Sequence, residues 1–321
     1  MGVFMSYLMG ILCLFLCSVS FSATETLSLS GAAISNENST SASENKSNLK
    51  LNEALTNKKF NENEDITDAK IKADSGSLST YSLKFNLSYY GPTLGQLDGK
   101  DQPNLDGSVG TYETSLGGSL GLRYRLDSKS SLSFGTGLKV IHPLHGAERT
   151  DIQTPYLNYD STFRLGGVQM RSSPGLSVTT LPNYTQVGQV GSITYDFNSI
   201  YNIPSSRFAV GLDANLSLFI YNRNYEPADK KSSRGAVQLY PTFKYNLSDK
   251  TSITTSTSLS WLSPRYRSNE TILLNRTVSQ RLGVGHAFTR DVYVYPYLTV
   301  YPSRLASDTT TFNLSTTFSL L

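Results

Sequence analysis

Hydrophobic and polar residues alternate along most of the chain after residue 80. In Tyr81–Tyr89, large apolar or aromatic residues occupy every second position, with serine, lysine and asparagine between them. Successive side chains of a β-strand point to opposite faces, so this parity predicts strands with one apolar and one polar face. The pattern predicts twelve strands, at residues 81–89, 112–126, 132–140, 157–165, 168–178, 193–197, 208–220, 237–247, 253–261, 272–288, 292–302 and 312–320.

Connections between these segments alternate in length. Gly166-Gly167 suits the positive-φ positions of a two-residue hairpin. Short turns of this kind fall at one end of the strands, and longer connections, such as residues 91–110, 143–155 and 222–235, fall mostly at the other end. Residues 156–181 are the least regular part, and reading them as a loop lowers the count to ten. Both counts are even, as in bacterial single-chain barrels.

Strand length distinguishes a membrane barrel from a soluble sandwich. Residues 112–126 and 208–220 exceed the ~5–6 residues typical of globular sheets and reach the ~9–11 that cross a bilayer obliquely. The polar face is rich in serine, threonine, asparagine and glycine, which suits a wet interior. These features predict a barrel with lipid outside and water inside.

Aromatic residues fit the same environment. The chain has 20 tyrosines and one tryptophan, Trp261. Amphipathic rings settle at the level of the lipid headgroups. We therefore expect the tyrosines and Trp261 to anchor the outer wall at the membrane interface.

The alternation continues to the C-terminus, through residues 309–321. In this respect the chain resembles the outer-membrane β-barrel class, whose last strand is recognised by the barrel-insertion machinery. That signal usually ends in an aromatic residue, whereas this chain ends in Leu321 with Phe318 close by. The resemblance covers residues 78–321. It implies an all-β, transmembrane, antiparallel up-and-down barrel in the cell outer membrane of a Gram-negative organism, in contact with outer-membrane lipid.

The N-terminus has the features of an export signal. Residues 3–19 are almost wholly apolar and carry no charge, and Ser20 and Ser22 are small residues suited to cleavage after residue 22. Residues 1–22 are therefore predicted to be a signal peptide. A membrane-anchoring helix is the alternative.

Residues 23–77 differ in composition from the rest of the chain. Six lysines and nine acidic residues give this segment a net charge of −3, against +6 for residues 78–321. Its only aromatic residue is Phe60, so it can bury little apolar area. Two interpretations stay open: a disordered periplasmic extension, or a plug that folds back into the barrel lumen.

The sequence offers little for catalysis or metal binding. Its three histidines are His142, His145 and His286, and both cysteines, Cys13 and Cys17, lie in the export signal. No histidine stands beside the serine or the clustered carboxylates that barrel phospholipases and proteases require, and no metal-ligand set is complete. We predict no enzyme, no metal and no cofactor. The net charge of +3 is too small to predict nucleic-acid binding.

Charged residues on the predicted inner face are the candidate functional residues. Eight basic residues face four acidic ones, and charges that line a pore bias which ions enter it. One interpretation is a narrow passive channel for small solutes with a mild anion preference. The other is a closed barrel, stiffened by internal ion pairs, that is structural or binds a partner through its loops; the oligomeric state is not predicted. The candidates are Lys84, Glu113, Arg123, Arg125, Lys139, Asp160, Arg164, Arg171, Asp196, Asp213, Lys244 and Arg281.

Overall fold

The computed structural model describes residues 58–103, 105, 112–222, 233–265, 272–273 and 278–320. All of them belong to one compact unit, Asn57–Leu321. The predicted signal peptide and residues 23–57 lie outside the described residues. In the described part, no helix has the length and apolar character needed to cross a membrane.

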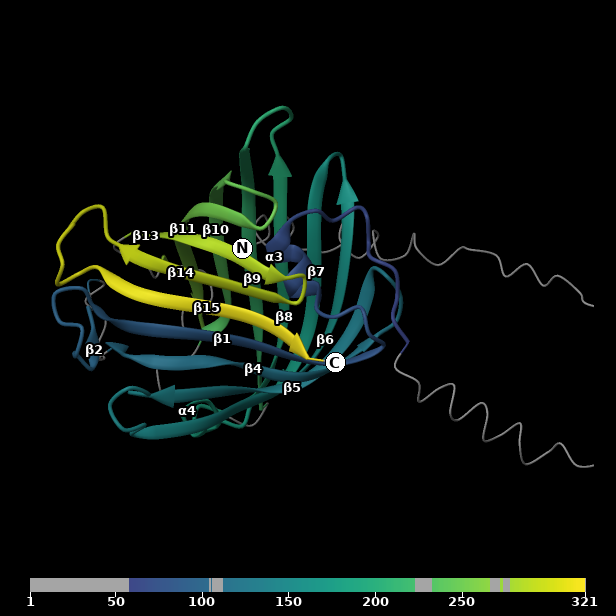
Figure 1. Ribbon diagram of the computed structural model, residues 1–321. Helices are drawn as coiled ribbons and strands as arrows, with labels where there is room; N and C mark the ends of the chain where they lie inside the picture. The colour runs from purple at the N-terminus through teal and green to yellow at the C-terminus, as the bar shows by residue number, and fades with distance from the viewer. Residues whose placement is uncertain are drawn as a thin grey trace, which may run out of the picture. The chain divides into compact units, whose positions relative to one another are not determined.

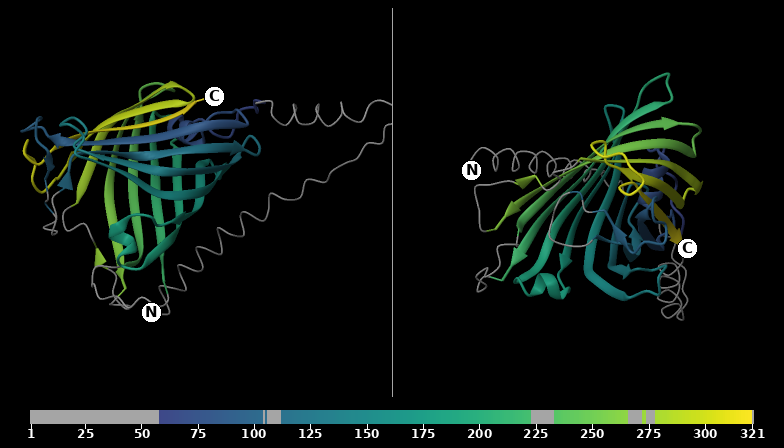
Figure 2. Two further views of the ribbon diagram at one scale, coloured as in Figure 1. Left: turned by 90° about the horizontal axis from the view of Figure 1, so that it is seen from below. Right: turned by 90° about the vertical axis from the view of Figure 1, so that its left-hand side faces the viewer.

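Twelve long antiparallel strands form one closed wall (Figure 1). Neighbours in sequence are neighbours in the wall, and the ring closes where β1 pairs with β15. In Figure 2 this closure appears as the yellow C-terminal strand beside the blue first strand. The wall strands are β1 (Tyr81–Thr93), β4 (Ser115–Arg125), β5 (Ser130–Ile141), β6 (Arg149–Leu165), β7 (Val168–Val178), β8 (Gln189–Asn202), β9 (Phe208–Tyr221), β10 (Ser233–Asn246), β11 (Thr251–Pro264), β13 (Ser279–Thr289), β14 (Val292–Val300) and β15 (Thr311–Leu320).

This architecture confirms the predicted up-and-down barrel and its count of twelve rather than ten. Both strands of the doubtful region are present, as β6 and β7, and they pair with each other through the expected hairpin. One extra strand, β12 (Ile272–Leu273), pairs with β11. The sequence predicted a single strand over 272–288, whereas the structure has β12 and β13 with undescribed residues between them.

The two ends of the barrel differ, and we call them the turn end and the loop end. The turn end holds the C-terminus and the short connections, including Gly166 and Gly167 with φ of +56° and +84°. This conformation favours glycine and closes the hairpin in two residues. The loop end carries the short sheet of β2 (Asp101–Gln102) and β3 (Tyr112–Glu113), and the one-turn helix α4 (Pro182–Thr185). The loop predicted over 143–155 is shorter than expected, because β6 begins at Arg149.

Side chains follow the predicted faces. Outward residues are apolar and open to the surroundings of the wall, such as Phe134 (62% exposed) and Leu165 (67%). Inward residues are polar and buried, such as Ser131 and Arg123, each 1% exposed. Because the outer surface is apolar along strands of 9–17 residues, it is suited to hydrocarbon rather than water.

The expectation that the tyrosines anchor the outer wall is wrong for several of them. Tyr293 and Tyr297 point inward and are 7% and 4% exposed. Glycines on the neighbouring strand make room for such rings: a Cβ on Gly285 would overlap the Tyr293 hydroxyl. Alternation shows which residues of a strand lie on the same face. A tyrosine does not show whether that face is toward lipid or toward the lumen, because the ring is compatible with both lipid and a polar interior.

The observed register predicts unequal effects of a buried charge on the two faces. Leu216 pairs with Tyr195 and Val237 on the outward face, and its neighbour Asn215 points inward to Asp196. Leu216→Arg is expected to lower the free energy of unfolding by about 2–4 kcal/mol, because it places a cation in hydrocarbon. Asn215→Arg, the matched inward change, should lower it by much less. Folding titrations in lipid vesicles measure both values, and equal losses would contradict the register.

Candidate functional site

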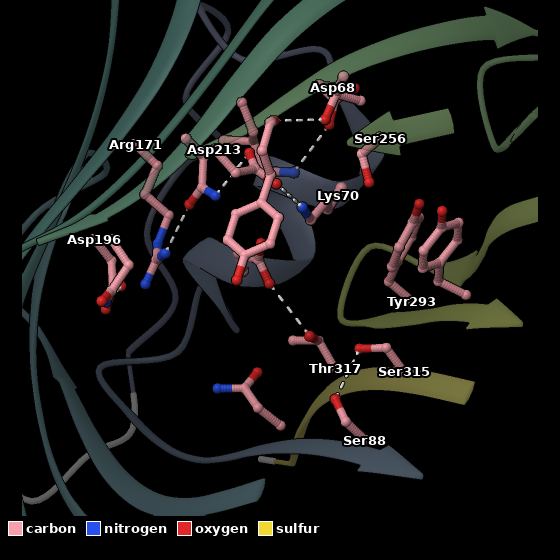
Figure 3. Close-up of a pocket in the computed structure, with 18 of the residues that line it drawn as sticks. Asp68, Lys70, Ser88, Arg171, Asp196, Asp213, Ser256, Tyr293, Ser315 and Thr317 are labelled. Atoms are coloured by element: carbon pink, nitrogen blue, oxygen red, sulfur yellow. Dashed lines mark hydrogen bonds and ion pairs between the residues drawn. The ribbon is translucent and has the colours of Figure 1, made fainter. Parts of the chain in front are cut away.

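Residues 58–80, which we call the inner segment, precede the first strand and lie inside the wall. The two ends of the segment are joined, since Phe60 N donates to Leu78 O at 2.9 Å. Between them runs the helix α3 (Ala69–Ser75), which contacts β6 and β7 as well as β13, β14 and β15. Because these strands lie in separate parts of the ring, α3 occupies the barrel lumen (Figure 3).

Local sequence sets the ends of α3. The Asp68 side chain accepts a hydrogen bond from Ile71 N at 3.0 Å, which caps the first turn. Gly76 follows the helix with φ of +71°, a conformation favourable for glycine, and donates to Ala73 O. A helix of 7 residues is too short to be stable alone in water. Its stability therefore comes from the barrel wall.

Apolar contacts dock one side of the inner segment. Inward-pointing apolar side chains on the wall meet isoleucine and alanine side chains of the segment in two buried clusters. Full burial of one such isoleucine contributes roughly 1.5–3 kcal/mol. The first cluster joins Ile66 and Ile71 to Ile200 and Ala209, and the second joins Ala73 to Ala287 and Tyr293.

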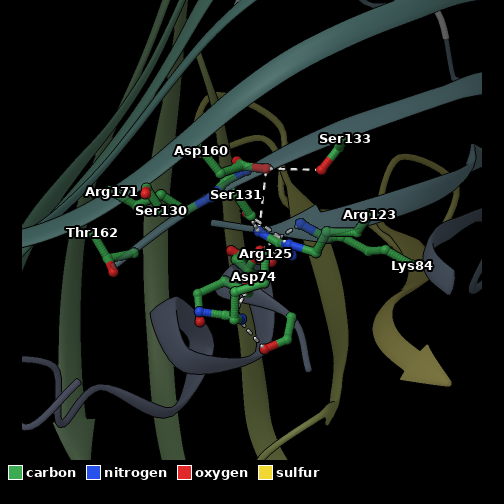
Figure 4. Close-up of polar contacts among 12 residues, drawn as sticks. Asp74, Lys84, Arg123, Arg125, Ser130, Ser131, Ser133, Asp160, Thr162 and Arg171 are labelled. Atoms are coloured by element: carbon green, nitrogen blue, oxygen red, sulfur yellow. Dashed lines mark hydrogen bonds and ion pairs between the residues drawn. The ribbon is translucent and has the colours of Figure 1, made fainter. Parts of the chain in front are cut away.

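Basic side chains of the wall surround the C-terminal end of α3 (Figure 4). The last carbonyls of a helix lack partners within the helix and carry partial negative charge, so cations are favourable there. Three residues of the wall strands, and Arg290 in the turn between β13 and β14, use this arrangement to hold the backbone of the inner segment. Arg125 donates to the carbonyls of Ser75 (2.7 Å), Gly76 (3.1 Å) and Ser77 (2.8 Å), Lys84 (2.5 Å) and Arg123 (3.5 Å) donate to that of Asp74, and Arg290 donates to that of Gly76.

Ion pairs connect the other end of the inner segment to the wall. Lys244 Nζ lies 2.5 Å from Asp68 Oδ2, and the two side chains are 9% and 6% exposed. Burial raises the pKa of the Asp68 carboxyl, but the neighbouring Lys244 ammonium outweighs burial and leaves the pKa below its ordinary value. Lys70 Nζ forms a second, more exposed pair with Asp213 at 2.6 Å.

A third network lies in the wall itself, beside α3. Asp160 accepts from Arg123 Nη2 at 3.3 Å, from Ser133 Oγ at 3.1 Å and also from Arg171. Arg123 donates twice to Ser131 Oγ, at 2.8 and 2.6 Å. Charges buried to this degree are stable only with partners, and here each has one or more.

Beyond α3, toward the loop end, the lumen contains a cavity of about 650 Å³. The inner segment forms its floor through Asp68, Lys70, Ile71 and Asp74. The wall contributes hydroxyl and amide groups, several tyrosines and a few charges (Figure 3). A polar cavity with one end blocked by the chain's own residues is the candidate functional site.

The structure brings most of the candidate residues from the sequence together. Lys84, Asp160, Arg171, Asp196, Asp213, Lys244 and Arg281 line the cavity. Arg123 and Arg125 lie against the inner segment, and Arg164 Nε donates to Asp65 O at 2.7 Å near the turn end. Lys139 lies on β5, and Glu113 pairs with Asp101 in the β2–β3 sheet, apart from the barrel wall.

Sequence reasoning missed the part of the site that the inner segment supplies, and most of its tyrosines. Asp68, Lys70 and Asp74 belong to a region expected to be either disordered or a plug, so none was a candidate. The opposite net charges of residues 23–77 and 78–321 were the available signal, since a net acidic segment can neutralise a basic lumen. The inward tyrosines had no comparable signal. Within the described residues, no group of three or more histidine, cysteine, aspartate or glutamate side chains could hold a metal ion.

A closed twelve-stranded barrel with an apolar outer wall and a polar interior defines an outer-membrane β-barrel protein. No protein-family model matches the chain, and no curated protein matches it.

Several solved outer-membrane barrels have a similar fold. The crystal structure of an outer membrane channel from Pseudomonas putida F1 is 13% identical, covers 77% of this chain and 98% of its own, and has a TM-score of 0.49. The NanC porin is 8% identical over 74% of this chain and 100% of its own, with a TM-score of 0.42. Outer membrane protein Omp33 from Acinetobacter baumannii is 11% identical over 75% and 98%, with a TM-score of 0.38. All three scores lie below 0.5, so what the chain does follows from its own residues rather than from these proteins.

Removing the Asp68 charge is expected to loosen the inner segment. Asp68→Asn keeps a capping side chain but leaves Lys244 buried without a partner, which costs about 3–5 kcal/mol. Backbone hydrogen exchange of residues 58–80 in the folded barrel should then rise by at least about a hundredfold. The matched control is Asp65→Asn, because Asp65 pairs with Lys129 in an exposed position (47% and 55%) and should contribute at most about 1 kcal/mol. Equal exchange in the two variants would contradict the docking role of the Asp68 pair.

The same ion pair predicts a pH dependence. A carboxyl whose folded pKa is depressed contributes stability above its unfolded pKa and loses it as pH falls through the folded value. Because the pKa of Asp68 lies below its ordinary value of 3.8, protection of residues 58–80 should stay constant from pH 8 to pH 5 and fall only in stronger acid. Hydrogen exchange, corrected for its intrinsic pH dependence, tests this. A loss of protection between pH 7 and pH 5 would show that another group controls docking.

Proposed function

We propose that the protein is a passive channel for small solutes in the cell outer membrane, closed at its turn end by its own inner segment. The observation that carries this proposal is the position of α3, which lies across the lumen and forms the floor of the cavity. The apolar wall would contact outer-membrane lipid, and the barrel-insertion machinery would assemble it. The proposal assigns no catalytic residue, metal, cofactor or nucleic acid to the protein.

The way the lumen is filled supports a channel rather than a solid barrel. In a barrel of eight strands the wall side chains fill the interior, and ~16–18 strands leave an aqueous channel. The lumen of a twelve-stranded barrel is therefore filled only where additional residues enter it. At the turn end those residues come from the inner segment. Near the loop end they are absent from the described chain, and the cavity of about 650 Å³ remains. Displacing the segment would therefore extend the cavity toward the turn end.

Charge supports an anion preference for the open channel only. With the segment docked, Lys84 and Arg125 donate to its carbonyls, and Lys244 pairs with Asp68. The donors of these cations are thus occupied while the channel is closed, and the charge of Lys244 is balanced by Asp68. Displacement of the segment would leave them facing the lumen, where together with Arg171 and Arg281 they outnumber the acidic wall residues Asp160, Asp196 and Asp213.

Planar-bilayer recordings with deletion variants test the proposal. Deleting residues 58–77 should produce steady conductance steps in a barrel that is silent or rarely open when intact. In a salt gradient, the reversal potential of the deletion variant should favour anions. Deleting residues 23–57, which leaves the inner segment in place, is the matched control and should not change conductance. Heat-modifiable migration in electrophoresis confirms that each barrel is folded.

A substitution keeps the test independent of the deletion. Asp68→Asn in the full chain should raise the open probability, because it weakens docking without shortening the protein. Silence from every folded variant would contradict the channel and favour a closed structural barrel. Equal conductance before and after deletion of residues 58–77 would contradict closure by the inner segment.

A further inference from the structure

One basic residue of the cavity differs from the others in its surroundings. Among the described residues, Arg281 on β13 forms no ion pair with a carboxylate and no hydrogen bond to the inner segment. Its guanidinium carbon instead lies 4.9 Å from the ring centre of Tyr240 and 5.6 Å from that of Tyr297. Each of the cavity's other basic residues has a partner: Lys70 pairs with Asp213, Lys84 donates to Asp74 O, Arg171 pairs with Asp160, and Lys244 pairs with Asp68.

Tyrosines surround this arginine from several strands. Tyr90 on β1 and Tyr297 on β14 both pair with Asn313 of β15, so they lie at one level of the barrel. Tyr295 and Tyr297 stack, with ring centres 5.0 Å apart. All of these rings line the cavity. We call Arg281 with Tyr90, Tyr240, Tyr295 and Tyr297 the Arg281 belt.

The belt has the chemistry to bind an anion that carries a ring. A guanidinium presents paired donors that match the two oxygens of a carboxylate, and stacking on tyrosine holds its plane while leaving those donors free. Tyrosine rings in turn offer flat faces to a ring-shaped solute. An inorganic ion would use the guanidinium but none of the four rings.

The rest of the cavity favours a solute rich in hydroxyl groups. Its wall is lined by amide and hydroxyl side chains, which donate to and accept from a polyhydroxylated ring. The volume of about 650 Å³ lies within the usual range for small-molecule sites. These polar side chains include the amides Asn86, Asn158, Asn198 and Asn215 and the hydroxyls Thr254 and Ser256.

We propose that the Arg281 belt binds sugar acids, with the Arg281 guanidinium on the carboxylate and the tyrosines against the sugar ring. The site lies on the loop side of α3, so a solute can occupy it while the inner segment is docked. This inference rests on the proposed function only for the idea that the bound solute is one the channel carries.

Calorimetric titration of the folded full-length barrel in detergent tests the site, with D-glucuronate as the probe. D-glucose lacks the carboxylate and propionate lacks the ring, so both should bind at least about tenfold more weakly than glucuronate. Arg281→Gln should weaken glucuronate binding by about tenfold or more and leave glucose unchanged. Arg281→Lys keeps the charge but loses the paired donors. Its affinity for glucuronate should lie between those of the intact protein and Arg281→Gln.

Matched variants separate the belt from general changes in charge or folding. Lys139→Gln removes another basic wall residue outside the cavity and should leave binding unchanged. Tyr297→Phe keeps the ring and should retain binding, whereas Tyr297→Leu should weaken it.

Three results would overturn the assignment: no glucuronate binding by the intact barrel at millimolar concentration, equal binding by Arg281→Gln, or equal affinity for glucose and glucuronate. Binding is measured without current, so its failure is distinct from failure of the channel. A barrel that binds glucuronate through Arg281 but never conducts would retain the site and contradict only the proposed function.

Discussion

The need of buried basic side chains for hydrogen-bond and ion-pair partners is the constraint on which the rest of this structure depends. A charge that points into a barrel and away from water is stable only with a partner, because desolvation costs several kcal/mol per ion. The wall supplies one such partner, Asp160, to Arg123 and Arg171. The inner segment supplies the others, as the Asp68 carboxylate and the carbonyls that end α3. The wall and the segment are therefore complementary parts of one electrostatic arrangement.

This dependence explains how a short peptide stays in the lumen. A helix of 7 residues with a few apolar side chains has little stability of its own. Its backbone carbonyls provide acceptors without adding bulky side chains, so the arginines and Lys84 can approach closely. The same contacts link docking to the charge of the lumen. Each cation that loses its contact with the segment is left facing the open lumen. A channel closed in this way would acquire its ionic selectivity when it opens.

The fold was largely predictable from the sequence, because parity reports directly on strand faces. The strands around Leu216 and Phe134 have the predicted register, and the Gly166-Gly167 hairpin is where its φ preference placed it. Strand ends were less predictable: β6 starts well before the predicted residue 157, because threonine and glutamine are compatible with both a strand and a loop.

The candidate site was predictable only for the charged residues of the wall. Charged wall residues such as Arg171, Asp160 and Lys244 follow from parity, but Asp68, the partner of Lys244, comes from a region where composition permits either disorder or a plug. The inward position of Tyr293 depends on space above Gly285 of the next strand, a relation between strands that a single-strand pattern does not contain. The Arg281 belt likewise results from strand order, since Tyr90, Tyr240 and Tyr297 lie far apart in sequence.

The most direct test of this account is thiol cross-linking between α3 and the wall in the assembled outer membrane. Ala73 of α3 and Ala287 of β13 lie in one buried cluster, and Phe288, the next residue of β13, points outward with 61% exposure. In a chain freed of Cys13 and Cys17, Ala73→Cys with Ala287→Cys should join through a short bifunctional thiol reagent. Ala73→Cys with Phe288→Cys should not. Absence of the first cross-link in a folded barrel, or equal yields for both pairs, would contradict docking of the inner segment within the lumen.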